Sequence, residues 1–275
     1  MKYGTLVRPT DPNHLEHCFQ PLREMGLTSC QLAYKPEIFL QEDAEKIRQT
    51  ADRYGIEISA HFIGYRDDFT IYDLRYGYMT NGLTAPAYRS QRLEYLIKGC
   101  TFVRWLGITD LIIHAGFIPN NPFDPEYGAL VAAIRLLGNY AKGLGVNLLF
   151  ETGAESPVTL LRLIEEAGCG NLYVNLDTGN CLMYGYANPV DALTTVGKYL
   201  RNIHLKDGLP PTDCYSLGKE AAVGEGEVDF LRFVKKLKAL GYDRFVTIER
   251  EISGQQQRED IVKAKTFFEQ LWLQS

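Results

Sequence analysis

Short apolar runs alternate with longer amphipathic segments along the whole chain. In the runs nearly every position is apolar, which is typical of parallel strands covered on both faces. In the longer segments apolar residues recur every three to four positions, as on one face of a helix. This pattern predicts strands near residues 2–8, 28–34, 56–61, 108–114, 145–151, 172–177, 201–206 and 244–250. It predicts helices over residues 12–25, 37–54, 90–106, 126–144, 157–167, 189–200, 229–240 and 255–273.

Glycine marks most of the junctions where a helical segment gives way to a strand. Examples are "REMGLTSCQLAY" and "AKGLGVNLLFETG". Glycine is favoured just past a helix end because it adopts the left-handed conformation without strain. The segment "SPVTLLRLIEEAG" has complete boundary signals, with Ser156 as the N-cap, Pro157 in the first turn and Gly168 at the end. Asp229 is expected to cap the helix that follows "GEGE" (224–227), a stretch expected to form a turn.

Eight strand–helix pairs in about 250 residues predict a (β/α)8 TIM barrel that occupies residues 1–275 as a single domain. The alternative is a doubly wound open sheet. That fold usually carries a glycine-rich phosphate-binding turn after its first strand. The corresponding segment here, "LVRPTDPNH", has no such turn. The barrel is therefore the favoured architecture.

Composition narrows the class of protein further. The 275 residues are 45% hydrophobic, enough for a large core, and the net charge is -5 with no run of Lys and Arg. This disfavours a nucleic-acid-binding surface. We expect no signal peptide, and no apolar stretch is long enough to cross a membrane. Six scattered cysteines fit free thiols in a reducing compartment. We expect a cytoplasmic protein without nucleic-acid or membrane partners.

Charged residues end several predicted strands, where burial makes a charge costly. Four consecutive strands, the fifth to the eighth, carry Glu151, Asp177, His204 and Glu249. In a barrel the C-terminal strand ends open onto the active site. Three carboxylates there repel one another, and an unpaired buried charge costs several kcal/mol. They require protonation, neutralisation by Arg or Lys, or a cation between them.

A divalent cation is the economical solution, because Lys206, Arg250 and Arg8 are the few basic residues available. Mixed oxygen and nitrogen ligands suit Mn²⁺, Mg²⁺, Co²⁺ or Zn²⁺. The alternative is a buried salt-bridge network in which Lys206 and Arg250 neutralise the acids. We predict one divalent metal ion, with the two glutamates, the aspartate and the histidine as its ligands.

Several motifs occur in a characteristic order: "FETG", "LDTGN", "IHLKD", "VGEGEVDF" and "TIERE". In this order the chain resembles the xylose isomerase-like superfamily of sugar isomerases and epimerases over essentially its whole length. The resemblance implies a TIM barrel that acts on a small-molecule carbohydrate, a sugar or a sugar phosphate. It implies proton transfer next to a carbonyl through a metal-bound enediolate, with Glu151 and Glu249 as catalytic residues. By analogy with the family we expect a homodimer or tetramer.

Four further polar residues are expected to bind substrate: His61, His114, Asn180 and Lys206. For the two histidines the alternative is a hydrogen-bonded core role, and for Lys206 it is a structural ion pair. Asn180 stands where related epimerases often have a histidine that holds substrate oxygens. Three other functions stay open: an inosose-type dehydratase with the same enolate chemistry, a non-catalytic sugar-binding barrel, and an abasic-site nuclease, which the acidic charge disfavours.

Overall fold

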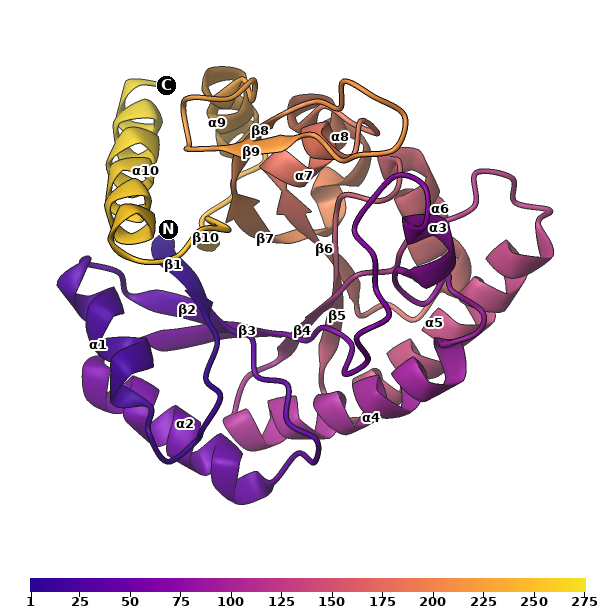
Figure 1. Cartoon of the computed structure of the whole chain (residues 1–275), viewed down its shortest axis with the longest axis horizontal. Helices are drawn as coiled ribbons and strands as arrows, with labels where there is room; N and C mark the ends of the chain where they lie inside the picture. Colours follow the sequence, from indigo (N-terminus) through magenta and orange to yellow (C-terminus); the bar gives the residue numbers. More distant parts are fainter.

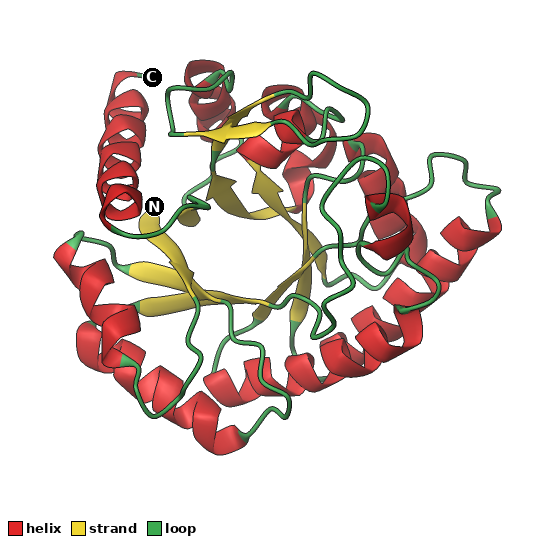
Figure 2. Ribbon diagram, viewed as in Figure 1, coloured by secondary structure: helices red, strands yellow, loops and turns green.

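Eight parallel strands close into a barrel. The computed structural model describes residues 1–275, and its strands pair in the order β1-β10-β7-β6-β5-β4-β3-β2. Figure 1 looks into the barrel and Figure 2 separates its strands from the surrounding helices. The barrel strands are β1 (Lys2–Val7), β2 (Ser29–Leu32), β3 (Glu57–Phe62), β4 (Asp110–Ile113), β5 (Asn147–Glu151), β6 (Leu172–Asp177), β7 (Leu200–Leu205) and β10 (Phe245–Ile248). The predicted (β/α)8 barrel is confirmed, and the doubly wound sheet is excluded.

The helices form the outer layer in Figure 1. They are α1 (Glu16–Glu24), α2 (Gln41–Tyr54), α3 (Gly77–Thr80), α4 (Arg89–Leu106), α5 (Pro125–Gly143), α6 (Pro157–Ala167), α7 (Thr178–Met183), α8 (Pro189–Val196), α9 (Phe230–Ala239) and α10 (Gln255–Gln274). A 3₁₀ turn, η1 (Gly197–Tyr199), extends α8. The predicted boundaries of α6 are confirmed: Ser156 accepts a hydrogen bond from the Thr159 amide, and Gly168 is left-handed with φ 66°. Asp229 caps α9 in the same way.

The main hydrophobic core lies between the barrel and its helices, in one cluster of 62 buried residues. The barrel interior is more polar. Alternate residues of a strand face opposite sides, and the buried polar residues include Gln31, Asn175, Asn202 and Thr247. Outward-facing residues therefore hold the fold together, while inward-facing ones are free to carry polar groups toward the barrel mouth.

The long loops contain small elements that the apolar pattern did not predict. Helices α3 and α7 follow β3 and β6, and a two-stranded antiparallel hairpin, β8 (Asp207–Leu209) with β9 (Lys219–Ala221), follows β7. Asp207 organises this hairpin because its carboxylate accepts hydrogen bonds from the amides of Gly208, Gly224, Gly226 and Val228. The turn expected at "GEGE" is thus wrapped around one buried carboxylate.

Two expectations from composition have a structural counterpart. All six cysteines are free thiols, and five of them are buried. None of the helices is both long and apolar enough to span a membrane.

Candidate functional site

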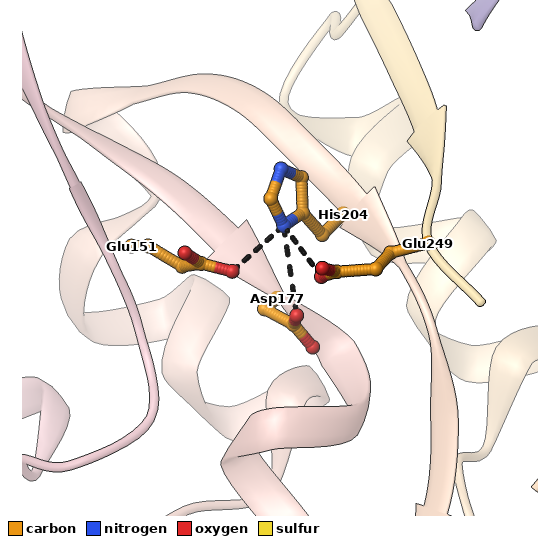
Figure 3. A group of neighbouring side chains, drawn as sticks. All are labelled: Glu151, Asp177, His204 and Glu249. Carbon is orange, nitrogen blue, oxygen red and sulfur yellow. Dashed lines mark hydrogen bonds and ion pairs between the residues drawn. The ribbon is translucent and has the colours of Figure 1, made fainter. Parts of the chain in front are cut away.

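Four predicted strand-end residues meet in one buried cluster at the C-terminal end of the barrel (Figure 3). One ligand atom from each of Glu151, Asp177, His204 and Glu249 lies within 4.8 Å of all the others. His204 Nδ1 stands at the centre, 2.7 Å from Glu151 Oε1, 3.0 Å from Glu249 Oε2 and 3.6 Å from Asp177 Oδ2. All four residues are at least 94% buried. The predicted cluster therefore exists as a geometric fact.

Local structure aims Asp177 into the cluster. The register of β6 and β7 sets Asp177 beside His204. The chain then turns directly into α7, whose N-cap is Asp177, and Oδ1 accepts a 2.7 Å hydrogen bond from the Asn180 amide. This fixes the carboxylate and leaves Oδ2 facing the cluster centre. In the same "DTGN" segment, a Cβ on Gly179 would lie 2.7 Å from Lys206 Cγ. Glycine is therefore needed for α7 to pack against Lys206.

Gln31 on β2 sets the orientation of the central histidine. Its side-chain oxygen accepts a hydrogen bond of 2.6 Å from His204 Nε2, and its amide nitrogen donates to Asn175 Oδ1 at 3.4 Å. With the proton on Nε2, a neutral imidazole presents the Nδ1 lone pair to three carboxylates. That arrangement is repulsive unless a positive charge sits between Nδ1 and the acids. A metal-ligating histidine commonly donates its other N–H to an oxygen in this way.

The cluster fits a divalent cation by its own unsatisfied groups. Asp177 Oδ2 and Glu249 Oε2, which face His204, are buried without a hydrogen-bond partner, and so is Glu151 Oε2 on the side of His114. Burial alone would lower the pKa of His204, but the adjacent Glu151 and Glu249 carboxylates hold it well above its usual value. Burial also raises the pKa of Asp177 to about 7. Three oxygens and one nitrogen around a point that demands positive charge are a suitable set for the ion.

The basic residues do not complete a salt-bridge network here. Arg250 binds Glu220 and Asp260 instead of the cluster. Lys206 makes its shortest contact with Glu251, at 2.5 Å, and its Nζ is 3.7 Å from Glu249 Oε2. The predicted alternative, in which Arg250 and Lys206 together neutralise the acids, is therefore wrong as far as Arg250 is concerned.

A cavity of about 380 Å³ opens onto the cluster. Its volume is in the range of small-molecule sites. Its lining combines charged, polar and aromatic side chains with two glycine or alanine positions: Arg8, Ala33, Lys35, Phe62, Gly64, Tyr72, His114, Glu151, Asn180, Met183, Tyr184, Leu217, Glu249 and Glu251. A larger cavity of about 570 Å³, lined by Asp110 and Arg244 among others, lies at the N-terminal strand ends and contains none of the cluster. The chemistry therefore belongs to the smaller cavity.

Three of the residues expected to bind substrate lie at or beside this cavity. His114 lines it and has Nε2 3.0 Å from Glu151 Oε2. Asn180 also lines it, and its side-chain oxygen accepts a 3.2 Å hydrogen bond from Lys206 Nζ. Lys206 itself is only 1% exposed and lies behind this surface. It touches the acids and Asn180 rather than the open cavity.

His61 is not at the cavity, and the expectation that it contacts substrate is corrected here. The side chain is fully buried, its Nε2 is 2.9 Å from the Tyr34 carbonyl, and its ring packs against Phe39 and Phe102. Burial lowers the pKa of His61 to about 4, so the ring is neutral. The inward position belongs to the next residue, Phe62, whose ring packs edge-on against His204. His61 is a core histidine.

Some residues of the site were missed by the sequence interpretation. Gln31 lies inside the predicted strand 28–34 and was given no role. Tyr72 and Glu251 line the cavity from a long loop and from just beyond β10. For Gln31 the signal was available, because a polar residue inside an apolar strand needs a buried partner. For Tyr72 no signal existed, since its position depends on the path of the loop after β3.

The fold and the cluster define a (β/α)8 barrel with a carboxylate–histidine site at the C-terminal ends of its strands. A family profile described as "Xylose isomerase-like TIM barrel" matches residues 19–271. The chain belongs to this family. A crystal structure of a xylose isomerase domain protein from Planctomyces limnophilus is 30% identical, with a TM-score of 0.91 over 98% of this chain and 96% of that one.

Two other relatives carry names of enzymes. The structure of an L-ribulose 3-epimerase superimposes with a TM-score of 0.75 over 99% of this chain and 95% of that one, at 17% identity, which is evidence for the fold alone. An inosose dehydratase from Geobacillus thermodenitrificans is 24% identical over 147 residues, which cover 46% of this chain and 48% of the dehydratase.

Proposed function

We propose that the protein is a divalent-metal-dependent sugar or sugar-phosphate isomerase or epimerase that moves a proton next to a carbonyl. In this proposal Glu151, Asp177, His204 and Glu249 hold one ion of Mn²⁺, Mg²⁺, Co²⁺ or Zn²⁺. Glu151 and Glu249 also carry the proton. The observation that supports it best is the convergence of three carboxylate oxygens on His204 Nδ1, two of which, Asp177 Oδ2 and Glu249 Oε2, have no hydrogen-bond partner.

Each glutamate has one oxygen toward the cluster centre and a second that points elsewhere. For Glu151, Oε1 faces His204 and Oε2 is 3.0 Å from His114 Nε2. For Glu249, Oε2 faces His204 and Oε1 is 3.9 Å from Arg8 Nη2. Both residues line the cavity. Each is therefore equipped to serve as a ligand with one oxygen and as a proton acceptor or donor with the other.

The bound ion would supply polarisation of the substrate carbonyl and its neighbouring hydroxyl, which makes the adjacent C–H more acidic. Against that background one ionised glutamate removes the proton from one face of the carbon, and the other, which starts the cycle protonated, gives its proton to the opposite face. Exchange with solvent then restores both protonation states. A carboxylate is ionised at neutral pH, so it is ready to act as the base. His114 beside Glu151 Oε2 keeps that oxygen oriented toward the cavity.

The cavity supports a polar, sugar-sized substrate. Aromatic and apolar side chains, among them Phe62, Tyr72 and Tyr184, lie next to the hydrogen-bonding groups of Asn180 and His114. Apolar walls with a few placed polar groups are usual for small-molecule sites. The name of the related L-ribulose 3-epimerase is in line with a ketose, which the proposal extends to this chain.

Deuterium wash-in tests the proposal. The protein is loaded with Mn²⁺ and incubated in D₂O with ketoses, ketose phosphates, inososes and hydroxypyruvate, with a chelated sample in parallel. Exchange at carbon that disappears with the chelator supports proton transfer at this site. Glu151→Gln and Glu249→Gln should each lower the exchange rate by about 10²–10⁴-fold, because each removes a general acid or base.

A matched control separates the catalytic role from a general effect of losing a carboxylate. Glu225→Gln makes the same change in an exposed loop residue and should leave exchange intact. The metal content of each variant shows whether a loss of exchange follows a loss of the ion. Unchanged exchange in Glu151→Gln, or exchange that persists in the chelated sample, contradicts the proposal.

A dehydratase is the second candidate, favoured by the likeness to inosose dehydratase over about half of the chain. It requires a proton donor for a departing hydroxyl. His114, 14% exposed in its side chain and lining the cavity, is the residue available for this. In the same assay this reaction appears as a loss of water from an inosose. Exchange without a change in mass beyond the deuterium favours the isomerase or epimerase.

A further inference from the structure

The wall of the cavity contributed by β1, β2 and the loop after β3 is basic. Arg8 follows the last residue of β1, and Lys35 lies three residues past the end of β2. Both line the same cavity as Glu151 and Glu249. Arg8 Nη2 is 3.9 Å from Glu249 Oε1, so this positive wall begins at the edge of the carboxylate cluster.

Lys35 has no ionic partner, although its side chain is held in place. A Cβ built on Gly64 would lie 2.6 Å from Lys35 Nζ and 3.2 Å from its Cε, so the lysine lies directly over the glycine backbone. Burial and the nearby charge of Arg8 lower the pKa of Lys35. No carboxylate approaches its ammonium group closely enough to form an ion pair. A lysine that is confined, next to a second cation and unpaired is suited to an anionic ligand.

The balance of charge around the cavity and the cluster also favours an anionic ligand. Four carboxylates belong to this region: Glu151, Asp177, Glu249 and Glu251. Three basic side chains face them: Arg8, Lys35 and Lys206. With a divalent ion in the cluster, the sum is one excess positive charge. Farther out, Asp68 and Arg66 act on Lys35 with opposite signs, and Asp67, which also acts on it, is paired with Arg92. Arg8 and Lys35 are both exposed at the rim of the cavity, where a ligand from solution can reach them, although salt screens part of this excess.

We propose that the substrate carries an anionic group, a carboxylate or a phosphate, that Arg8 and Lys35 bind while the carbonyl end faces the carboxylate–histidine cluster. This inference rests on the proposed function and narrows its substrate class to acidic sugars or sugar phosphates. An arginine and a lysine together provide the fork-shaped and point-charge donors that such anions favour. With a neutral ketose, Lys35 stays without an ionic partner.

Calorimetric binding of compounds that have no carbonyl tests this inference without any turnover. The probes are D-glucitol, D-gluconate and D-glucitol 6-phosphate, added to the Mn²⁺-loaded protein. At least one anionic probe should bind about tenfold or more tightly than D-glucitol, equivalent to about 1.4 kcal/mol. Which of the two it is distinguishes a carboxylate from a phosphate. Lys35→Met and Arg8→Gln should each abolish the preference.

Arg66→Gln is the matched control. Arg66 is an exposed basic residue near Lys35 whose nearest acid is Glu37 at 3.9 Å, and it does not line the cavity. This variant should retain the preference for the anion. Equal affinities for all three probes overturn the inference. So does a preference that survives Lys35→Met, because the anion would then be bound by the ion itself. Neither result depends on isotope exchange, so this inference and the proposed function can fail independently of each other.

Discussion

Replacing Gln31 by Met should weaken metal binding although Gln31 is not a proposed ligand. Gln31 and His204 are fully buried, and the amide oxygen of Gln31 is 2.6 Å from His204 Nε2. Methionine has similar length but accepts no comparable hydrogen bond. In the variant the Nε2 proton loses its partner, and the tautomer protonated on Nδ1, which cannot bind a cation there, becomes competitive.

The expected loss is about 10- to 100-fold in affinity, the usual effect of removing such an outer partner of a metal-bound histidine. At about 1.4 kcal/mol for each factor of ten this corresponds to about 1.4–2.8 kcal/mol. The cost of leaving one buried donor without an acceptor is about 1–3 kcal/mol, the same range from an independent argument. The estimate from metal-site partners and the estimate from buried hydrogen bonds therefore give the same range for the loss of binding free energy.

The assay is a titration with Mn²⁺ against a chromophoric chelator near neutral pH. Gln31→Glu is the control, because a carboxylate restores the acceptor at the same distance. The amide of Asn175, whose nitrogen has no partner, can turn to donate to it. Thermal unfolding in excess chelator checks that the variants fold alike without the ion. Equal affinities for Gln31→Met and the parent protein, or an equal loss in both variants, would refute the reasoning.

Four further predictions concern stability and local order. Arg92→Met should lower the free energy of unfolding in urea by about 3–5 kcal/mol. The side chain of Asp67 is 3% exposed and pairs with Arg92 at 2.7 Å, so the variant leaves a buried carboxylate without its cation. A loss below about 1 kcal/mol contradicts this prediction. The hydrogen bond from Arg92 lowers the pKa of Asp67 in the folded state. The pair therefore stabilises the fold at pH values above the unfolded-state pKa of Asp67. In an acid unfolding series this contribution should be lost as the pH falls through the folded-state pKa. Asp207→Asn should loosen the 224–228 turn, and limited proteolysis there should accelerate, since the amides of that turn lose their shared carboxylate. Gly179→Ala should destabilise by about 1–3 kcal/mol because its Cβ would overlap Lys206, and an unchanged melting temperature would show that the lysine moves freely.

The barrel and the cluster were predictable because they depend on local signals. Apolar runs, glycine junctions and strand-end acids are all visible within a few residues of one another. Closing eight such units into a barrel then brings the C-terminal strand ends together without knowledge of any long-range contact. For this reason Glu151, Asp177, His204 and Glu249 could be grouped from sequence alone.

His61 shows where the same reasoning fails. The predicted strand 56–61 ended on His61, so the histidine was placed at the barrel mouth like the acids. The observed strand, Glu57–Phe62, is one residue longer at that end. Because side chains alternate along a strand, a shift of one residue exchanges the inward and outward faces. Phe62 therefore faces the cavity and His61 the helices. An apolar run without polar alternation gives no signal to fix this register.

Arg250 illustrates a second limit, because one of its partners, Glu220, comes from a hairpin that the apolar pattern did not predict. Glu220 on β9 binds the side chain of Arg250 and also accepts from the Glu251 amide, at 2.6 and 2.8 Å. Arg250 is thereby drawn away from the cluster, and Glu251 is set where it receives the Lys206 ammonium group.

The hairpin thus determines which cations reach the carboxylate cluster. If Arg250 pointed inward, two cations would face three acids and a salt-bridge network would nearly balance. With Arg250 removed and Lys206 shared with Glu251, Asp177 Oδ2 and Glu249 Oε2 stay without hydrogen bonds beside His204 Nδ1. The missing charge is about that of a divalent ion. Closing the barrel does not by itself require Arg250 to pair with Glu220 and Asp260 while these buried oxygens stay unpaired.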